Sequence, residues 1–281
     1  MAEGHGSHNP LEHAMDHPTI ELPWGSGGRV FDLPRIHTGI PIDGFRDFQI
    51  TRFMVMEVVA ALLIIAIMIP LARHVAKRPV SRGAFMNAFE VLVSFIRDKV
   101  ARPSIGGHGA DAFIPYLLTV FFFVLFNNLL GLIPAGASAT GNINVTAVLA
   151  IATLGAVIYA GIRESGPVQF WIKLVPSMDV PIWLKVFLWP LMFVIELAGL
   201  LIRHFVLAVR LFANMLAGHV VLGVILGFIL IAGGNLVYLV TPASIIGVVL
   251  LSFLELLVAF LQAYIFTLLS ALFIGSAVHP H

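Results

Sequence analysis

Cysteine is absent from the 281-residue sequence, and charged residues make up only 11% of it. The absence of cysteine excludes disulfides, thiol catalysis and metal sites with cysteine ligands. The scarcity of charge excludes an ordinary soluble domain, in which about a quarter of the residues are charged. The net charge of +1 gives no indication of nucleic-acid binding, so we expect no nucleic-acid partner.

Hydrophobic residues are correspondingly abundant, at 59% of the sequence, and the mean hydropathy is +0.99. This composition is typical of a multi-pass membrane protein. The length allows about five or six crossings of roughly 20 residues each and leaves no room for a sizeable soluble catalytic domain. We therefore expect an all-α integral membrane protein, with residues 51–281 as its membrane domain.

Residues 1–50 form a polar tail rich in Gly, Pro, His and acidic residues. We expect this tail to be mostly irregular. The first apolar run begins only near Phe53, which argues against a cleavable signal peptide. Four histidines in the tail could suggest a metal site: His5, His8, His13 and His17. Because polar tails often carry unpaired histidines, we expect neither a metal ion nor a cofactor.

Five apolar runs predict membrane helices, at 53–72, 113–134, 145–162, 186–231 and 236–278. The first three each fit a single crossing. Between the first two runs, residues 80–102 carry apolar side chains at helical spacing among charged ones. That pattern predicts an amphipathic helix lying on the membrane surface.

The last two apolar runs are too long for upright single crossings, because at 1.5 Å per residue each would extend about 65–70 Å. Either each run bends into two crossings, or each forms one long and strongly tilted helix. Residues 211–221 offer little turn chemistry, so we favour tilted helices. A turn joining them into a hairpin is predicted at five residues: Gly233, Gly234, Asn235, Thr241 and Pro242.

Lysine and arginine occur in alternate connections between the apolar runs. The segments after the first and third runs contain them, whereas 135–144 and 232–244 contain none. The positive-inside rule therefore places the tail outside, as an extracytoplasmic segment, and the 80–102 helix and the C-terminus inside.

Arg210 lies at membrane depth in a stretch that is almost free of charge. Such an arginine costs about 2.5–3.5 kcal/mol, so we expect it to face a partner, a cavity or an ion path. Glu196, Arg203 and Arg210 recur every seven residues and share one helix face, which Asn214 extends. Arg203 could instead reach the membrane surface or pair with Glu196.

Three further polar residues accompany this stripe. His219 falls on the opposite side of the helix from Arg210, and Glu255 and Gln262 are seven residues apart in the last run. Asn214 and Gln262 could simply join helices by hydrogen bonds. Glu255 could form a fixed ion pair with Arg210, although such a pair would add little stability.

Proton exchange is within reach of this set of side chains. Histidine titrates near neutral pH and a buried glutamic acid can be shifted into that range. An arginine does not deprotonate in a protein, so Arg210 can attract, repel or block but cannot relay protons. The combination indicates aqueous half-paths that end at a permanent positive charge.

Three motifs carry a resemblance to a known family. The first is Arg210-Leu-Phe-Ala-Asn-Met-Leu-Ala-Gly-His219, the second spans Glu255 to Phe266, and the third spans Asn127 to Pro134 and is followed by Asn142-Ile-Asn144-Val-Thr146. In order and spacing they resemble subunit a of the F-type ATP synthase, and the likeness covers about 85 to 275.

The resemblance implies a non-catalytic stator subunit of a rotary motor in the bacterial inner membrane. It would carry two proton half-channels to and from a ring of c subunits, and Arg210 would attract each ionised ring carboxylate and separate the half-channels. Further expected partners are b-type peripheral stalk subunits, the catalytic head reached through the stalks, and membrane lipid. The coupling ion, proton or sodium, stays open.

The resemblance also implies roles for further residues. His219 and Glu255 would belong to the outer half-channel, although other members carry the acid and the histidine in the reverse order. Gln262 would neighbour Arg210, and Glu196 would contribute to the inner exit. Three asparagines would line the outer inlet, or else make structural hydrogen bonds: Asn128, Asn142 and Asn144. Glu57 receives no role.

Two alternatives remain beside this function. One is a stand-alone secondary ion transporter or channel, against which the lack of an inverted repeat argues. The other is a purely structural membrane scaffold, which would leave the charges inside the membrane unexplained.

Overall fold

A computed structural model describes residues 19–22, 29–37, 47–77, 83–106, 109–133, 138–176, 181–232 and 236–279. The histidines at positions 5, 8, 13 and 17 lie outside these residues, as do Gly233, Gly234 and Asn235 of the expected turn.

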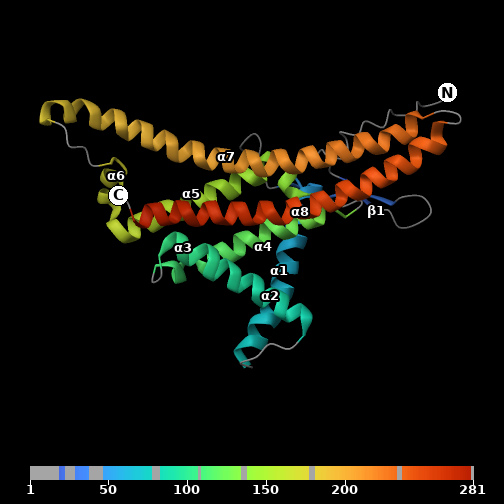
Figure 1. Ribbon diagram of the computed structural model, residues 1–281, viewed down its shortest axis with the longest axis horizontal. Coiled ribbons are helices and arrows are strands. Elements are labelled where there is room, and N and C mark those ends of the chain that lie inside the picture. The colour runs from blue at the N-terminus through green and yellow to red at the C-terminus, as the bar shows by residue number, and fades with distance from the viewer. Residues whose placement is uncertain are drawn as a thin grey trace. The chain divides into compact units, whose positions relative to one another are not determined.

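Five of the described helices are long and apolar enough to cross a membrane. They are α1 (Arg52–Lys77), α4 (Ile114–Gly131), α5 (Ile143–Ser165), α7 (Ile182–Ile231) and α8 (Val237–Val278), shown in Figure 1. The predicted all-α membrane fold with five membrane helices is confirmed. The observed helices begin and end within a few residues of the apolar runs.

The last two membrane helices are each continuous, at 50 residues for α7 and 42 for α8. At 1.5 Å per residue they extend about 75 and 63 Å, so they can lie in a membrane only when tilted. One expectation is wrong: Thr241 and Pro242 belong to α8 rather than to a turn. Pro242 is inside α8, so the helix lacks the bond that an N–H at this position would donate to the Tyr238 carbonyl, yet it continues through the proline.

Short strands occur in the tail, which was expected to be irregular. β1 (Thr19–Leu22) pairs antiparallel with β2 (Arg29–Asp32), and β3 (Arg35–His37) pairs antiparallel with β4 (Asp47–Gln49). Thr19 lies opposite Asp32, and Arg35 lies opposite Gln49. The sequence Thr-Ile-Glu-Leu alternates polar and apolar residues, a pattern typical of a strand.

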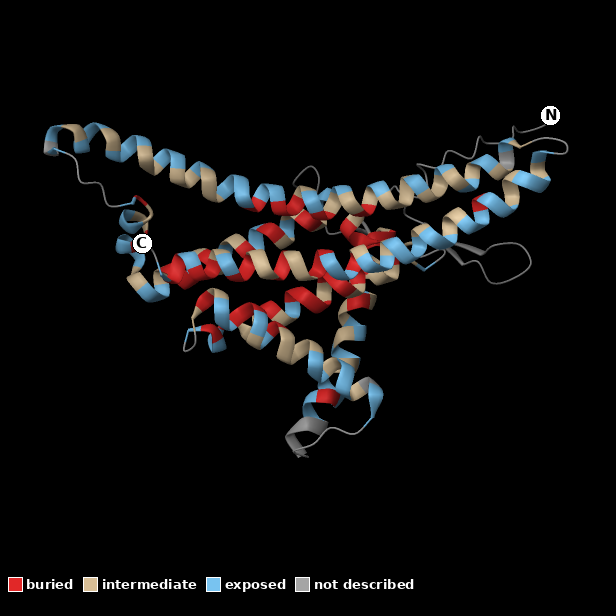
Figure 2. Cartoon of the chain, viewed as in Figure 1, coloured by how far each residue is buried: buried red, intermediate tan, exposed pale blue. Residues whose placement is uncertain are grey.

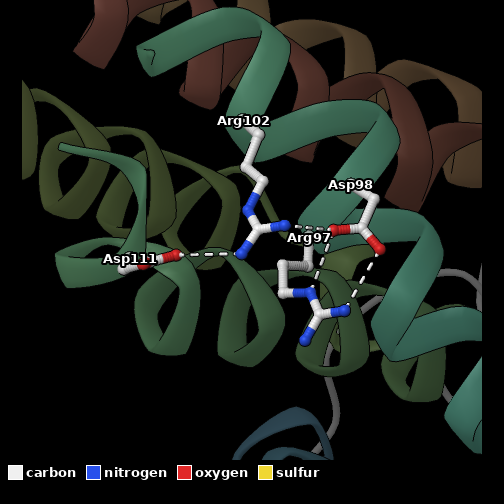
Figure 3. Close-up of polar contacts among 4 residues, drawn as sticks. All are labelled: Arg97, Asp98, Arg102 and Asp111. Carbon is white, nitrogen blue, oxygen red and sulfur yellow. Dashed lines mark hydrogen bonds and ion pairs between the residues drawn. The ribbon is translucent and has the colours of Figure 1, made fainter. Parts of the chain in front are cut away.

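Helical structure is present where the surface helix is predicted, but it is divided into three parts: α2 (Ala84–Phe95), a π-helical turn η2 (Ile96–Ala101) and α3 (Arg102–Ile105). Its described charged residues are exposed, apart from the half-buried Asp98. Asp98 accepts hydrogen bonds from Arg97 Nε and from Arg102 Nη1, both at 3.0 Å, and Asp111 lies 3.8 Å from Arg102 (Figure 3). Hydrogen bonding to Arg97 and its positive charge hold the pKa of Asp98 below its usual range.

The apolar side of this segment does not face lipid along its whole length. Ile96, Val100 and Ile105 are completely buried. Phe95 packs against Tyr264 of α8 with ring centroids 5.6 Å apart, and His279 Nε2 hydrogen bonds with the Ile105 carbonyl at 3.0 Å. The second half of the helix therefore packs against protein.

The chain divides into two compact units. Unit 1 comprises Met1–Ile64, Leu125–Asn142 and Phe212–Leu261, and unit 2 comprises Ile65–Val124, Ile143–Leu211 and Gln262–His281. Short helices complete them: η3 (Ala110–Ala112) and α6 (Pro167–Lys173) in unit 2, and η4 (Ala139–Gly141) in unit 1. Figure 2 shows burial concentrated along α4 and the C-terminal half of α8, whereas α7 is mostly exposed or half-buried.

Candidate functional site

Three of the predicted site residues line one pocket in unit 1. The pocket has a volume of about 190 Å³, and Asn214, His219 and Glu255 supply its polar groups. The rest of the lining is apolar and comes from α7, α8 and Leu132. Asn214 and His219 are about 140° apart around α7, yet both contribute to this pocket.

Glu255 packs against the backbone of α7 inside this pocket. A Cβ added to Gly218 would overlap the Glu255 carboxylate oxygen and lie 3.2 Å from its Cδ. The side chain is half-buried and, among the described residues, it makes no hydrogen bond or ion pair. A carboxyl group without a protein partner can exchange a proton with water or with another titratable group.

His219 has a buried Nε2 with no hydrogen-bond partner in the part of the chain that the structure describes. Because a buried nitrogen without a partner is costly, water is the natural ligand for it. The pocket volume of about 190 Å³ is sufficient for several water molecules. The arrangement therefore joins a histidine, a carboxyl group and an amide around a space that water can fill.

Arg210 is exposed on α7 and makes no hydrogen bond or ion pair with any described residue. Five exposed apolar residues lie near it at helical spacing: Val206, Ala213, Ala217, Val221 and Val224. An arginine on such a face has no local reason to be retained, since it neither pairs nor packs. The structure thus leaves Arg210 free to meet a partner from outside the chain.

Gln262 of α8 is 5% exposed and belongs to unit 2, as does Arg210. No hydrogen bond joins the two side chains in the described part of that unit. The expectation that Gln262 neighbours Arg210 stays a prediction.

A second pocket, of about 320 Å³, lies in unit 2 and contains Glu196 and Arg203. Lys173 and Ser276 supply further polar groups to it. The alternative that Arg203 pairs with Glu196 is not observed, because no carboxylate in the described residues lies within 4 Å of the Arg203 guanidinium. The Arg203 side chain is instead exposed.

Asn128 is completely buried and engaged in hydrogen bonds. Its Oδ1 accepts a hydrogen bond from Thr140 Oγ1 at 2.7 Å, and its Nδ2 donates one to the Ala259 carbonyl at 3.4 Å. This pattern fits the structural alternative for Asn128. Asn142 is half-buried and Asn144 exposed, and neither belongs to the lining of the pocket that holds His219.

Sequence reasoning missed two residues at these pockets. Gly218 directly precedes His219 and meets the Glu255 carboxylate, and Lys173 lies in the pocket that contains Glu196. No local pattern marks either residue, because their positions depend on the packing of distant helices. No group of three His, Asp or Glu residues in the described ranges could hold a metal ion.

Comparison with known proteins gives consistent similarities. The model of the family described as "ATP synthase A chain" matches residues 54–275. The chain is 41% identical over 274 residues to "ATP synthase subunit a" of Myxococcus xanthus, covering 96% of this chain and 88% of that protein. It is 42% identical over 271 residues to "ATP synthase subunit a" of Chloroherpeton thalassium, covering 95% and 76%.

Proposed function

The chain belongs to the ATP synthase A chain family, and we propose that it forms two proton half-channels that lead to and from a rotating ring of c subunits. It is a multi-pass membrane protein and a stator subunit of an F-type ATP synthase, and it is not itself the catalytic subunit. The proposal concerns how its residues move protons.

The observation that carries the proposal is the exposed Arg210 without a partner among the described residues. A carboxylate on the ring would supply that partner each time it passes. Because an arginine stays protonated, Arg210 would draw the carboxylate into its ionised form and block direct proton passage between the half-channels. The small residues Ala213 and Ala217 on the same exposed face favour close approach of a neighbouring helix.

The pocket with Asn214, His219 and Glu255 supports an outer half-channel. Water in this pocket would connect the His219 nitrogen and the Glu255 carboxyl group, both of which can exchange protons. Because both groups line one pocket, the reversed order of acid and histidine relative to other members preserves its chemistry. Gln262 would act beside Arg210, and Asn128, Asn142 and Asn144 are the proposed outer inlet.

The pocket with Glu196 supports an inner exit, because it too places a carboxyl group beside a space that water can fill. In the proposed orientation the N-terminus lies outside and the C-terminus lies in the cytoplasm of a bacterial cell. Protons would enter from outside, travel on the ring and leave near Glu196. Each charge that crosses 100 mV supplies about 2.3 kcal/mol, so several are needed for each ATP.

Further partners follow from the same assignment. Peripheral stalk subunits of the b type would hold this chain still against the catalytic head while the ring turns. A stand-alone transporter, by contrast, would need neither ring nor stalk.

Replacement of Arg210 tests the proposal. We expect Arg210→Ala to assemble into the complex but to abolish ATP synthesis and ATP-driven proton pumping in vesicles. Arg203→Ala is the matched control, since Arg203 is also exposed on α7 and should leave synthesis measurable. Near-normal synthesis in Arg210→Ala would contradict the mechanism, and ion transport by the isolated chain in liposomes would favour the stand-alone transporter.

A further inference from the structure

The pocket of about 320 Å³ in unit 2 has a composition that proton exit alone does not explain. Two cationic side chains, Lys173 and Arg203, line it together with one carboxylate, Glu196. Its volume lies at the small end of the range in which proteins bind small molecules, roughly 300–1,000 Å³. The pocket is large enough for a polar headgroup.

The wall that carries Lys173 is held firmly in place. Phe170 of α6 is 6% exposed, and its ring fills the space beside Gly161 of α5 so closely that a Cβ at Gly161 would overlap it. Lys173 Nζ donates a hydrogen bond to Ser165 Oγ at 3.2 Å. α6 therefore presents Lys173 to the pocket from a packed position.

The charged side chains of this pocket do not form ion pairs with one another in the described part of unit 2. In the described part of unit 2, neither Lys173 nor Arg203 has a carboxylate within 4 Å, and Glu196 has no cation within that distance. If all three are ionised, the pocket carries one net positive charge. A ligand with one negative charge would complete the balance.

The apolar part of the lining indicates a ligand that is not wholly polar. Val157 and Phe170 are buried beneath the pocket, and Leu174 and Leu200 complete its wall. A free anion would gain nothing from this surface. A phospholipid would place its phosphate at the cations and its acyl chains along the apolar residues.

We infer that this pocket binds the headgroup phosphate of an anionic phospholipid, held between Lys173 and Arg203. Basic pockets between transmembrane helices at the cytoplasmic side of a membrane bind such headgroups. The inference rests on the proposed function only for the orientation, which puts the end of α8 and hence Ser276 at the cytoplasmic surface. One phosphodiester group also supplies the single negative charge that the pocket lacks.

Photolabelling of the whole ATP synthase complex tests this inference. The complex is reconstituted into phosphatidylcholine vesicles that contain a photoactivatable phosphatidylglycerol, and labelled peptides of this chain are mapped by mass spectrometry. We expect labelling in 157–176 and 196–203. Photoactivatable phosphatidylcholine is the comparison probe and should label these peptides far less.

Substitution of Lys173 provides the decisive comparison. We expect Lys173→Gln to lower the labelling about fivefold, because one basic residue contributes about 1 kcal/mol to binding an anionic lipid. Lys173→Arg should retain it, and so should Lys185→Gln, a control outside the pocket. ATP-driven pumping by the same preparations shows whether the proposed function fails independently.

Three outcomes would overturn the inference. If Lys173→Gln leaves the labelling unchanged, the Lys173 ammonium does not bind the headgroup phosphate. Equal labelling by the two lipid probes would make the contact independent of headgroup charge. Loss of labelling when millimolar inorganic phosphate is present during irradiation would assign the pocket to a soluble phosphate instead of a lipid.

Discussion

The carboxylate of Glu255 on α8 lies against the backbone of Gly218 on α7, in the space where any other residue would place its Cβ. The absence of a side chain at position 218 thus fixes how far the carboxyl group enters the pocket that His219 also lines. A change at Gly218 should act on Glu255 without altering any titratable group.

Gly218→Ala should therefore slow proton flow although it introduces only a methyl group. Alanine favours a helix over glycine by about 1 kcal/mol, so helix propensity cannot account for a loss. The control is Gly227→Ala, at a glycine of α7 with open space around it. ATP-driven acidification of vesicles measures the effect, and equal rates in both variants would show that the contact is unimportant.

Glu255→Gln and His219→Ala should each slow proton flow without abolishing it, because water and the remaining group still line the pocket. The dependence of flux on pH should also change, since one titratable group has been removed. Met215→Leu, a substitution of similar volume in the same pocket lining, is the control. If both substitutions leave flux and its pH dependence as in the wild type, these residues do not form the outer half-channel.

Gly275→Ala should destabilise unit 2 by about 1–3 kcal/mol, the usual cost of overpacking. A Cβ at this position would collide with the backbone carbonyl of Ser104 in α3, which cannot move like a side chain. Gly247→Ala is the matched change, because its Cβ would make an ordinary contact at 3.7 Å with Ile225. Thermal dissociation of the purified complex distinguishes the two. Equal dissociation temperatures for the two variants would mean that the contact of Gly275 with α3 does not stabilise this end of α8.

Asn128→Ala should lower stability by about 1–3 kcal/mol, because buried groups lose their hydrogen-bond partner. Asn144→Ala, at an exposed position, should cost much less. Proton flux per assembled complex separates the two roles proposed for Asn128. Flux that falls while stability is unchanged would favour the inlet role over the structural one.

Asp98→Asn should reduce thermal stability slightly at neutral pH, and the difference should disappear in acid. Hydrogen bonding to Arg97 and its charge lower the pKa of Asp98 from 3.8. A group with a lowered pKa stabilises the folded chain above its ordinary pKa and loses that effect as the pH falls through the lowered value. If the difference in thermal stability between Asp98→Asn and the wild type persists at the lowest pH, the charge of Asp98 is not its cause.

The membrane helices could be predicted from the sequence because hydropathy acts locally. Each apolar run must satisfy its backbone hydrogen bonds internally, so it forms a helix. The long run that ends at Ile231 is predicted as a single helix because residues 211–221 offer little turn chemistry. The same local reasoning failed at Pro242, because a proline near the start of a helix resembles one in a turn.

The grouping of side chains was only partly predictable. Helical spacing selected Asn214, His219 and Glu255 as polar exceptions, and the structure brings these three to one pocket. Spacing could not reveal that Glu255 meets Gly218, or that Glu196 shares a pocket with Lys173. Those contacts depend on how separate helices pack, which no pattern within one helix records.

The hydrogen bond between His279 and the Ile105 carbonyl joins positions that are 174 residues apart. During synthesis at about 5–20 residues per second, roughly 9–35 s pass between the appearance of one partner and the other. During that interval α3 lacks its hydrogen bond with the end of α8. Unit 2 therefore gains this contact only after the end of α8 has been made, so a chain released before that point would lack the His279 partner of the Ile105 carbonyl.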